Sequence, residues 1–117
     1  MQTTRNAVDR IETVTAATFD DRVIRGSGAI VVEFMSYGCG HCRVLEPILQ
    51  HVAAMLAPRE RFFRVNIAAD EALAEQYGIE ATPTLVMFEN ATELTRIEGP
   101  NPDASSLMTA LSRPFAA

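Results

Sequence analysis

Apolar and polar residues follow one another along this chain in blocks that predict alternating strands and helices. Residues 29–35 form a mostly continuous apolar run rich in β-branched side chains, the pattern of a strand covered on both faces. From Cys39 onward, apolar residues recur at helical spacing and predict a long amphipathic helix that ends before Pro58. Pro47 lies inside this helix, where its ring removes one backbone hydrogen bond and is expected to cause a kink. The middle of the chain is therefore expected to be a central strand followed by a long helix.

Shorter blocks on both sides complete the expected order of elements. Further strands are expected at 11–14, at an edge of the sheet, and at 61–67, 84–89 and 94–98, with further helices behind Thr15 or Thr18, at 71–77 and at 104–111. Asn90 and Ala91 predict a hairpin turn between the last two strands, although glycine would fit its second position better. The order βαβαβαββα predicts an α/β protein with a central mixed β-sheet flanked by helices on both faces.

Length and charge limit the number of domains and the kinds of partner. The 117 residues fit a single domain, which we expect to span residues 11–117 behind a polar N-terminal arm at 1–10. A formal net charge of −5 argues against nucleic acid and anionic membranes as partners, because both require a basic surface. Residues 1–10 contain no apolar segment of the kind that directs export, and the longest apolar run, 29–32, is too short to span a membrane. We therefore expect a cytoplasmic protein.

The motif Cys39-Gly40-His41-Cys42 begins the predicted long helix directly after the central strand. Unpaired backbone N–H groups and the dipole at a helix N-terminus stabilise an anion, so Cys39 is the expected nucleophilic thiolate. Cys42 lies one turn further along the helix, where it can attack a mixed disulfide and release the substrate. Two ordinary buried cysteines are the alternative, but a C-x-x-C that opens a helix after a strand is typical of redox proteins.

A metal site is the other chemistry that two cysteines and two histidines suggest. His41 lies between the cysteines and is expected to point away from a metal that they share, whereas His51 is more than two helical turns beyond Cys42. We therefore expect no metal within one chain and no bound cofactor, since the Cys39–Cys42 pair is itself the redox centre. A cluster that bridges two chains stays open at this point.

The chain resembles the thioredoxin family over nearly its whole length from Ile11 to the C-terminal helix. The residues that carry the resemblance are Val14-Thr15 with Phe19-Asp20, the strand at 28–34, the CGHC motif, Pro47-Ile48-Leu49, Val65-Asn66-Ile67, Tyr77-Gly78-Ile79, Thr82-Pro83-Thr84-Leu85 and Gly99. This combination is highly specific. It implies a thioredoxin fold with thiol–disulfide chemistry at Cys39 and Cys42.

The resemblance also implies a surface that binds substrate. It implies that the Thr82–Pro83 bond is cis and lies against the disulfide, where the backbone of Thr82 is offered to an extended substrate. Gly38, Tyr37 and Gly99 belong to the same expected surface. Gly38 takes the place of the aromatic residue that usually precedes the first cysteine, so Tyr37 either partly fills this gap or is a plain surface aromatic.

An acidic residue and a basic residue accompany the cysteines in this family. Glu33 matches the buried acid on the central strand, where a raised pKa allows it to move a proton to or from Cys42. A solvent-exposed carboxylate at the end of a strand is the alternative for Glu33. Arg64 stands where many thioredoxins have lysine and is expected to hold the charge of Glu33 in check, and Pro47 is a second supporting residue.

These features predict a protein thiol–disulfide oxidoreductase that reduces or exchanges disulfides in protein substrates. We expect a monomer that receives electrons from a thioredoxin reductase-type donor. Two alternatives stay open. His41 and Gly40 complete the candidate catalytic group. His41 and Glu33 are typical of protein disulfide isomerases, and they favour oxidation or isomerisation in an oxidising compartment. The absence of tryptophan keeps open a thioredoxin-like binding or assembly module with little catalytic role.

Overall fold

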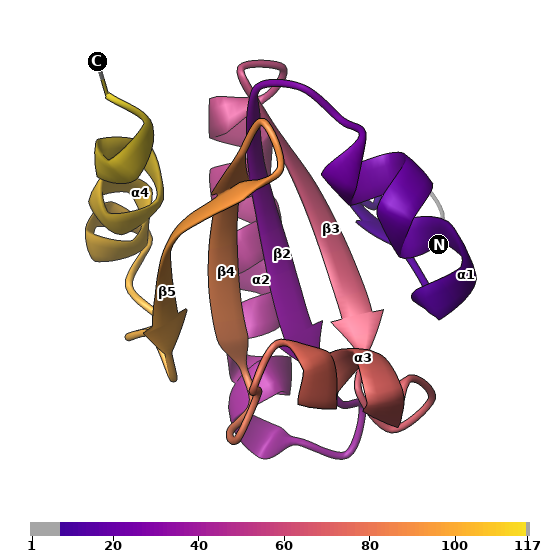
Figure 1. Cartoon of the computed structure of the whole chain (residues 1–117). Coiled ribbons are helices and arrows are strands. Elements are labelled where there is room, and N and C mark those ends of the chain that lie inside the picture. Colours follow the sequence, from indigo (N-terminus) through magenta and orange to yellow (C-terminus); the bar gives the residue numbers. More distant parts are fainter. Residues whose placement is uncertain (1–7, 117) are drawn as a thin grey trace.

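The apolar run at 29–35 forms β2 (Ala29–Met35), the central strand of a five-stranded sheet (Figure 1). The computed structural model describes residues 8–116. The strands lie in the order β1-β3-β2-β4-β5, where the others are β1 (Ile11–Thr13), β3 (Glu60–Asn66), β4 (Thr84–Glu89) and β5 (Thr92–Glu98). Because β2 runs parallel to β3 and antiparallel to β4, the sheet is mixed, and the predicted α/β architecture is confirmed.

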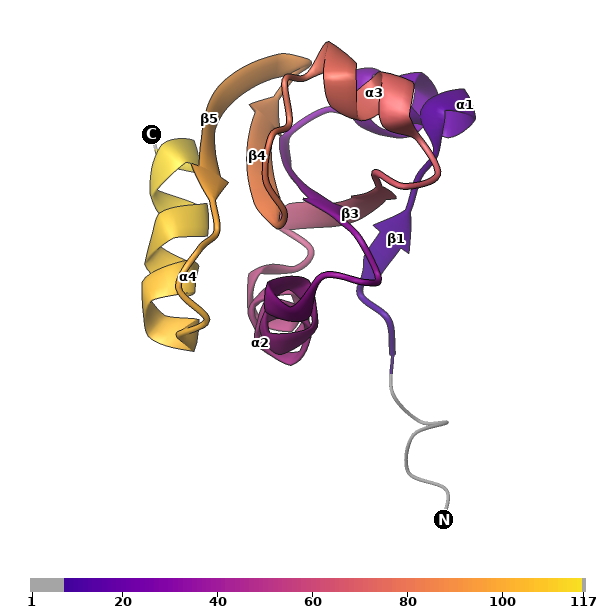
Figure 2. The same ribbon diagram turned by 90° about the horizontal axis from the view of Figure 1, so that it is seen from below.

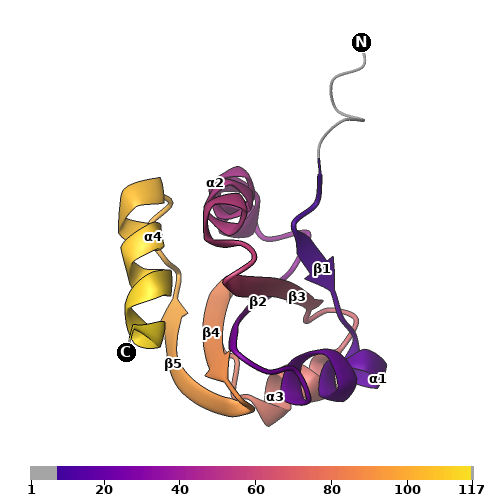
Figure 3. The ribbon, with the colours of Figure 1, turned by 90° about the horizontal axis from the view of Figure 1, so that it is seen from above.

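Helices cover both faces of this sheet. One face carries α2 (Gly40–Leu56) and α4 (Ala104–Ser112), and the other carries α1 (Ala16–Phe19) and α3 (Glu71–Gln76) (Figures 2 and 3). One turn of π-helix, η2 (Asp20–Ile24), continues α1, and a short 3-10 turn, η3 (Arg113–Phe115), continues α4. Within residues 8–116, no helix is both long enough and apolar enough to cross a membrane.

Alternate side chains of β2 point into two separate hydrophobic cores. Val31 packs in the core beneath α2 and α4, whereas Val32 packs in the core on the α1 and α3 side. An aromatic cluster contributes to the second core, with neighbouring ring centroids 5.3–6.5 Å apart among Phe19, Phe34, Tyr77 and Phe88. Because side chains alternate along a strand, Glu33 lies on the same face as Val31, beneath α2. The fold therefore places a carboxyl group under the helix that carries the cysteines.

Some element boundaries differ from the expected ones by one or two residues. The third strand begins at Glu60 because this residue already pairs with Ala29 of β2. Asn90 and Ala91 form the turn between β4 and β5 with positive φ angles of 50° and 73°, the geometry of a type I′ turn. The long helix α2 runs through Pro47 without a break.

Candidate active site

Cys39 lies where the loop after β2 turns into α2. It is the N-cap residue of α2, with an extended backbone, and its Sγ accepts a hydrogen bond from the Cys42 N–H at 3.2 Å. The first N–H groups of a helix have no partner within the helix, so a side-chain acceptor is favoured at this position. The sulfur of Cys39 therefore takes the place that a capping oxygen takes in other helices.

Burial and hydrogen bonding act in opposite directions on the ionisation of Cys39. Burial of the sulfur raises its pKa, but hydrogen bonds from the thiol of Cys42, the side chain of Thr82 and the backbone N–H groups of Cys42 and His41 lower it. Together the hydrogen bonds outweigh burial, so the pKa of Cys39 lies below the ordinary 9.0. Since Cys39 is also partly exposed, its thiolate is open to a substrate.

Cys42 has the opposite character. Only 2% of its surface is exposed, and burial together with its hydrogen bond to Cys39 raises its pKa to about 11. Both cysteines are free thiols in this structure. The site thus holds an outer thiol that ionises readily and an inner thiol that keeps its proton until a base removes it.

The loop before β4 lies against Cys39. The thiol of Cys39 donates a hydrogen bond to the carbonyl oxygen of Thr82 at 3.5 Å, and the Thr82–Pro83 peptide bond is cis. The Gly99 N–H donates to the carbonyl oxygen of Pro83 at 2.8 Å. Thr82 and Pro83 are therefore brought to the cysteines, while Gly99 fixes the loop that carries them.

The imidazole of His41 points to the segment after β5. Its Nε2 donates a hydrogen bond to the carbonyl oxygen of Pro100 at 3.1 Å. The ring lies over Gly99, where an added Cβ would be 3.5 Å from the imidazole Cε1 and where a φ of 55° favours glycine. In this structure the backbone N–H of His41, rather than its ring, is among the groups that lower the pKa of Cys39.

Tyr37, Gly38 and Gly40 form an exposed rim beside the cysteines. Tyr37 is 61% exposed, and its carbonyl oxygen accepts a hydrogen bond from Nη1 of Arg43 at 3.2 Å. A Cβ added at Gly38 or Gly40 would meet no other group closer than 4.0 Å among the described residues. Neither glycine is therefore required by packing, and the rim is open to a partner.

Glu33 is buried beneath α2, with 1% of its surface exposed. Neither of its carboxyl oxygens has a hydrogen-bond partner within residues 8–116. Burial, the negative charge of Glu46 and that of ionised Cys39 raise the pKa of Glu33 to about 7, against the opposing charge of Arg64. The carboxyl group therefore takes up and releases its proton near neutral pH.

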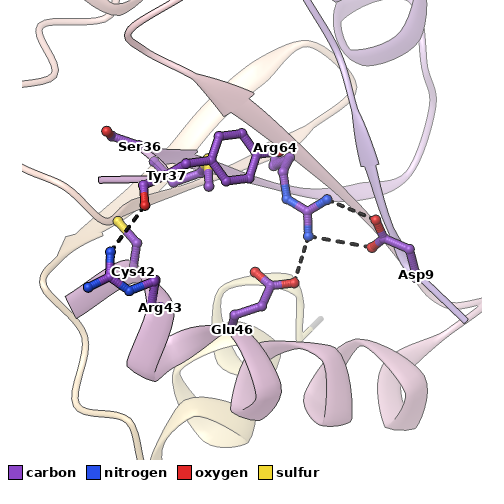
Figure 4. Close-up of a pocket in the computed structure, with 8 residues that line it drawn as sticks. Asp9, Ser36, Tyr37, Cys42, Arg43, Glu46 and Arg64 are labelled. Atoms are coloured by element: carbon purple, nitrogen blue, oxygen red, sulfur yellow. Dashed lines mark hydrogen bonds and ion pairs between the residues drawn. The ribbon is translucent and has the colours of Figure 1, made fainter. Parts of the chain in front are cut away.

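Arg64 forms ion pairs with two acids other than Glu33. Its Nη1 donates to Oδ2 of Asp9 at 2.9 Å, and its Nη2 donates to Oε2 of Glu46 at 2.7 Å (Figure 4). The charge of Arg64 lowers the pKa of Glu33 but acts without a hydrogen bond between the two side chains. Sequence reasoning missed Asp9 and Glu46. The four-residue spacing of Glu46 and Gln50, whose side chains hydrogen-bond at 2.9 Å across one helical turn, is the sequence signal that could have indicated this ion cluster.

A cavity of about 300 Å³ lies between Cys42 and this ion cluster. Figure 4 shows Cys42 and Arg43 on one side of the cavity and Arg64 with its two acids on the other. The described residues contain no group of three or more His, Cys, Asp or Glu side chains that could hold a metal ion.

A dithiol at the start of a helix, with an outer thiol of lowered pKa and an inner thiol of raised pKa, defines a site of thiol–disulfide exchange. Comparison with known proteins assigns the family. The sequence model of the thioredoxin family matches residues 10–113. The chain belongs to the thioredoxin family and is a protein-disulfide oxidoreductase.

Individual relatives agree with this assignment. The chain is 34% identical to a thioredoxin of Chlamydia pneumoniae over 89 residues, which cover 76% of this chain and 84% of that protein. It is 32% identical to a thioredoxin of Chlamydia trachomatis serovar D over 103 residues, 88% of this chain and 97% of that protein. The solved structure of a mutant thioredoxin from Halobacterium salinarum NRC-1 covers 93% of this chain and 94% of its own, with 24% identity and a TM-score of 0.80. This last likeness shows that the fold is shared.

Proposed function

We propose that this protein reduces disulfides in protein substrates, with Cys39 as the nucleophile and Cys42 as the resolving thiol. Proteins of this family act on protein disulfides, and the contrast between the two cysteines supports the assignment of roles. Cys39 is partly exposed and has a lowered pKa, whereas Cys42 is buried and has a pKa of about 11. A substrate therefore meets a thiolate first and a protonated thiol second.

Reduction proceeds in two exchanges of disulfide bonds. The Cys39 thiolate attacks one sulfur of the substrate disulfide, a Cys39–substrate disulfide forms, and the other substrate sulfur leaves as a thiolate and takes up a proton. The Cys42 sulfur then attacks Cys39, the mixed disulfide breaks, and the second substrate sulfur leaves and takes up a proton. The substrate gains two electrons and two protons, which the two cysteines lose as they form a disulfide.

Glu33 is the proposed proton acceptor for the second exchange. Cys42 must lose its proton before it can attack, and its raised pKa makes this loss unfavourable without a base. Glu33 is buried beneath the same helix and titrates at about 7, so its carboxylate is a base of suitable strength at neutral pH. Changing Glu33 to Gln is therefore expected to slow turnover at neutral pH, whereas unchanged turnover across the pH range contradicts a proton-transfer role.

The surface that receives the substrate is proposed to consist of the rim at Tyr37 and Gly38 and the loop at Thr82 and Pro83. Residues 79–83 lie outside any strand, and the Thr82 carbonyl oxygen is already within hydrogen-bond distance of Cys39. An extended substrate segment can therefore pair with the backbone of this loop while its disulfide reaches Cys39. Gly99 takes part indirectly, by holding Pro83.

We also make proposals about the electron donor, the cofactor requirement, the oligomeric state and the cellular location of the protein. The family supports a thioredoxin reductase-type protein as the source of electrons and a dithiol that needs no bound cofactor. We also propose that the chain acts as a monomer in the cytoplasm, as one domain that begins at residue 11.

Trapping of the mixed disulfide tests the assignment of the two cysteines. Cys42→Ser is expected to accumulate a covalent adduct with a disulfide substrate such as insulin, because attack by Cys39 occurs but release does not. Cys39→Ser is expected to form no adduct and to have no reductase activity. Adducts are identified by mass spectrometry under non-reducing conditions, with the double variant as the control. An adduct through Cys42 in the Cys39→Ser variant would reverse the roles, and a wild-type protein that cannot reduce insulin would favour a binding module.

A further inference from the structure

Arg64 and Glu33 are neighbours on the sheet that do not form an ion pair. They are register partners on β3 and β2, which run parallel to each other. Side chains of paired residues on adjacent strands point to the same face, and the strands lie about 4.8 Å apart. An arginine in this place is within reach of the carboxylate beside it. Nevertheless, Nε of Arg64 and both carboxyl oxygens of Glu33 have no hydrogen-bond partner within residues 8–116.

Two acidic residues, Asp9 and Glu46, bind the guanidinium group of Arg64. Besides its bonds to Asp9 and Glu46, Arg64 donates from Nη1 to the carbonyl oxygen of Ile11 at 3.1 Å. Gln50 joins the two acids, since its Nε2 donates to Asp9 at 2.6 Å and to Glu46 at 2.9 Å. In Figure 4 the guanidinium group points toward Asp9 and Glu46. The group thus has several charged and polar partners, and none of them is Glu33.

We infer that Asp9 and Glu46 are positioning residues that hold Arg64 away from Glu33, so that Glu33 forms no ion pair with Arg64 and remains available as the proton acceptor for Cys42. This inference rests on the proposed function of Glu33. If either acid is removed, Arg64 loses a partner and turns toward the unpaired carboxylate of Glu33, its register partner on β2. An ion pair between them would stabilise the carboxylate and weaken it as a base.

The charged and titratable groups around Glu33 come from three parts of the fold. Arg64 faces Glu33 from β3, whereas Glu46 and Cys39 come from α2 and its N-cap. Leu85, the register partner of Glu33 on β4, carries no charge. Glu46 therefore acts on Glu33 in two ways, directly as a like charge and through Arg64. Asp9 is not among the groups that shift the pKa of Glu33 directly, so its effect is expected to pass through Arg64.

The titration of Glu33 followed by carbon-13 NMR tests this inference. The measurement is made on the disulfide form, in which neither cysteine titrates, and Glu33→Gln identifies the signal. Asp9→Asn and Glu46→Gln are each expected to lower the midpoint of Glu33 by about one pH unit. Glu46→Asp, which keeps the charge, is expected to stay near the wild-type midpoint. Glu75→Gln, a similar change on the exposed side of α3, is the control and is expected to leave the midpoint unchanged.

A second set of variants shows whether the effect passes through Arg64. In an Arg64→Gln background, Asp9→Asn is expected to leave the midpoint of Glu33 unchanged, and the shift caused by Glu46→Gln is expected to shrink to its direct part. The inference is overturned if Asp9→Asn fails to lower the midpoint in the presence of Arg64, or lowers it equally in its absence. This titration does not depend on turnover, so it can fail while the trapping experiment succeeds, and the reverse.

Discussion

The backbone and the side chain of His41 are expected to act on the ionisation of Cys39 in different ways. Its N–H lowers the pKa of Cys39, while its imidazole is bonded to Pro100. The imidazole, when protonated, also adds positive charge near the N-terminus of α2, which favours the thiolate and makes the disulfide more oxidising. The reduction potential is the quantity that combines these effects.

We predict a wild-type potential between that of thioredoxin, about −270 mV, and that of protein disulfide isomerase, about −180 mV. His41→Pro removes both the N–H and the imidazole, so it is expected to raise the pKa of Cys39 and move the potential toward the thioredoxin value. His41→Ala keeps the N–H and serves as the matched variant. Equilibration with glutathione buffers measures the potential. If neither variant differs from the wild type, His41 does not tune the site.

The roles of individual residues could be predicted from sequence only where the effect is local. The ionisation of Cys39 follows from its place at the start of a helix, which the spacing of apolar residues already indicates. The partners of Arg64 could not be predicted in this way. Asp9 is 55 residues and Glu46 is 18 residues away along the chain, and only the pairing of β1 with β3 and the packing of α2 bring them together.

At the scale of elements, the turn between β4 and β5 departs from the residue type that its geometry favours. Asn90 is well suited to a positive φ, but Ala91 has a φ of 73°, where its Cβ is crowded. Ala91→Gly is therefore expected to stabilise the fold by about 1 kcal/mol in urea unfolding. Ala54→Gly, at an exposed position inside α2, is the control and is expected to destabilise by about 1 kcal/mol. A loss of stability in Ala91→Gly would contradict the turn geometry.

The order and type of the elements were predictable because each carries its own pattern of apolar residues. The residues at which the elements begin and end were not predictable, because long-range strand pairing determines them. Glu60 illustrates this limit, since a charged residue gives no strand signal, yet it pairs with Ala29 and is only 3% exposed. The turn of π-helix at Asp20–Ile24 likewise has no distinct pattern in the sequence.

At the scale of the whole molecule, two buried carboxyl groups set the dependence of stability on pH. Burial raises the pKa of both Glu33 and Glu60 from 4.5 to about 7. Between these values the folded protein binds more protons than the unfolded chain, so the free energy of unfolding falls as pH rises from 4.5 to 7. Glu33 alone accounts for about 3 kcal/mol of this fall in the free energy of unfolding. Asp9 and Glu12 have lowered pKa values, so stability also falls when they are protonated at acid pH.

We therefore predict that stability is greatest near pH 5 and declines toward neutral pH. Replacing both carboxyl groups, in a Glu33→Gln and Glu60→Gln double variant, is expected to remove most of this decline and to make the protein more stable than the wild type at pH 8. Urea unfolding at pH 4, 5, 6, 7 and 8 measures the effect, with Glu75→Gln as the control. A wild-type stability that rises from pH 5 to 7, or a decline that persists in the double variant, would contradict it.

The proposed mechanism depends on the difference in ionisation between Cys39 and Cys42, and the pH dependence of alkylation measures this difference most directly. The reduced protein is treated briefly with iodoacetamide at a series of pH values, and mass spectrometry of peptides shows which cysteine has reacted. We predict that Cys39 is alkylated first, with a midpoint below the ordinary thiol value of 9.0, while Cys42 remains unmodified at neutral pH. Alkylation of Cys42 before Cys39, or a Cys39 midpoint at or above 9.0, would contradict it.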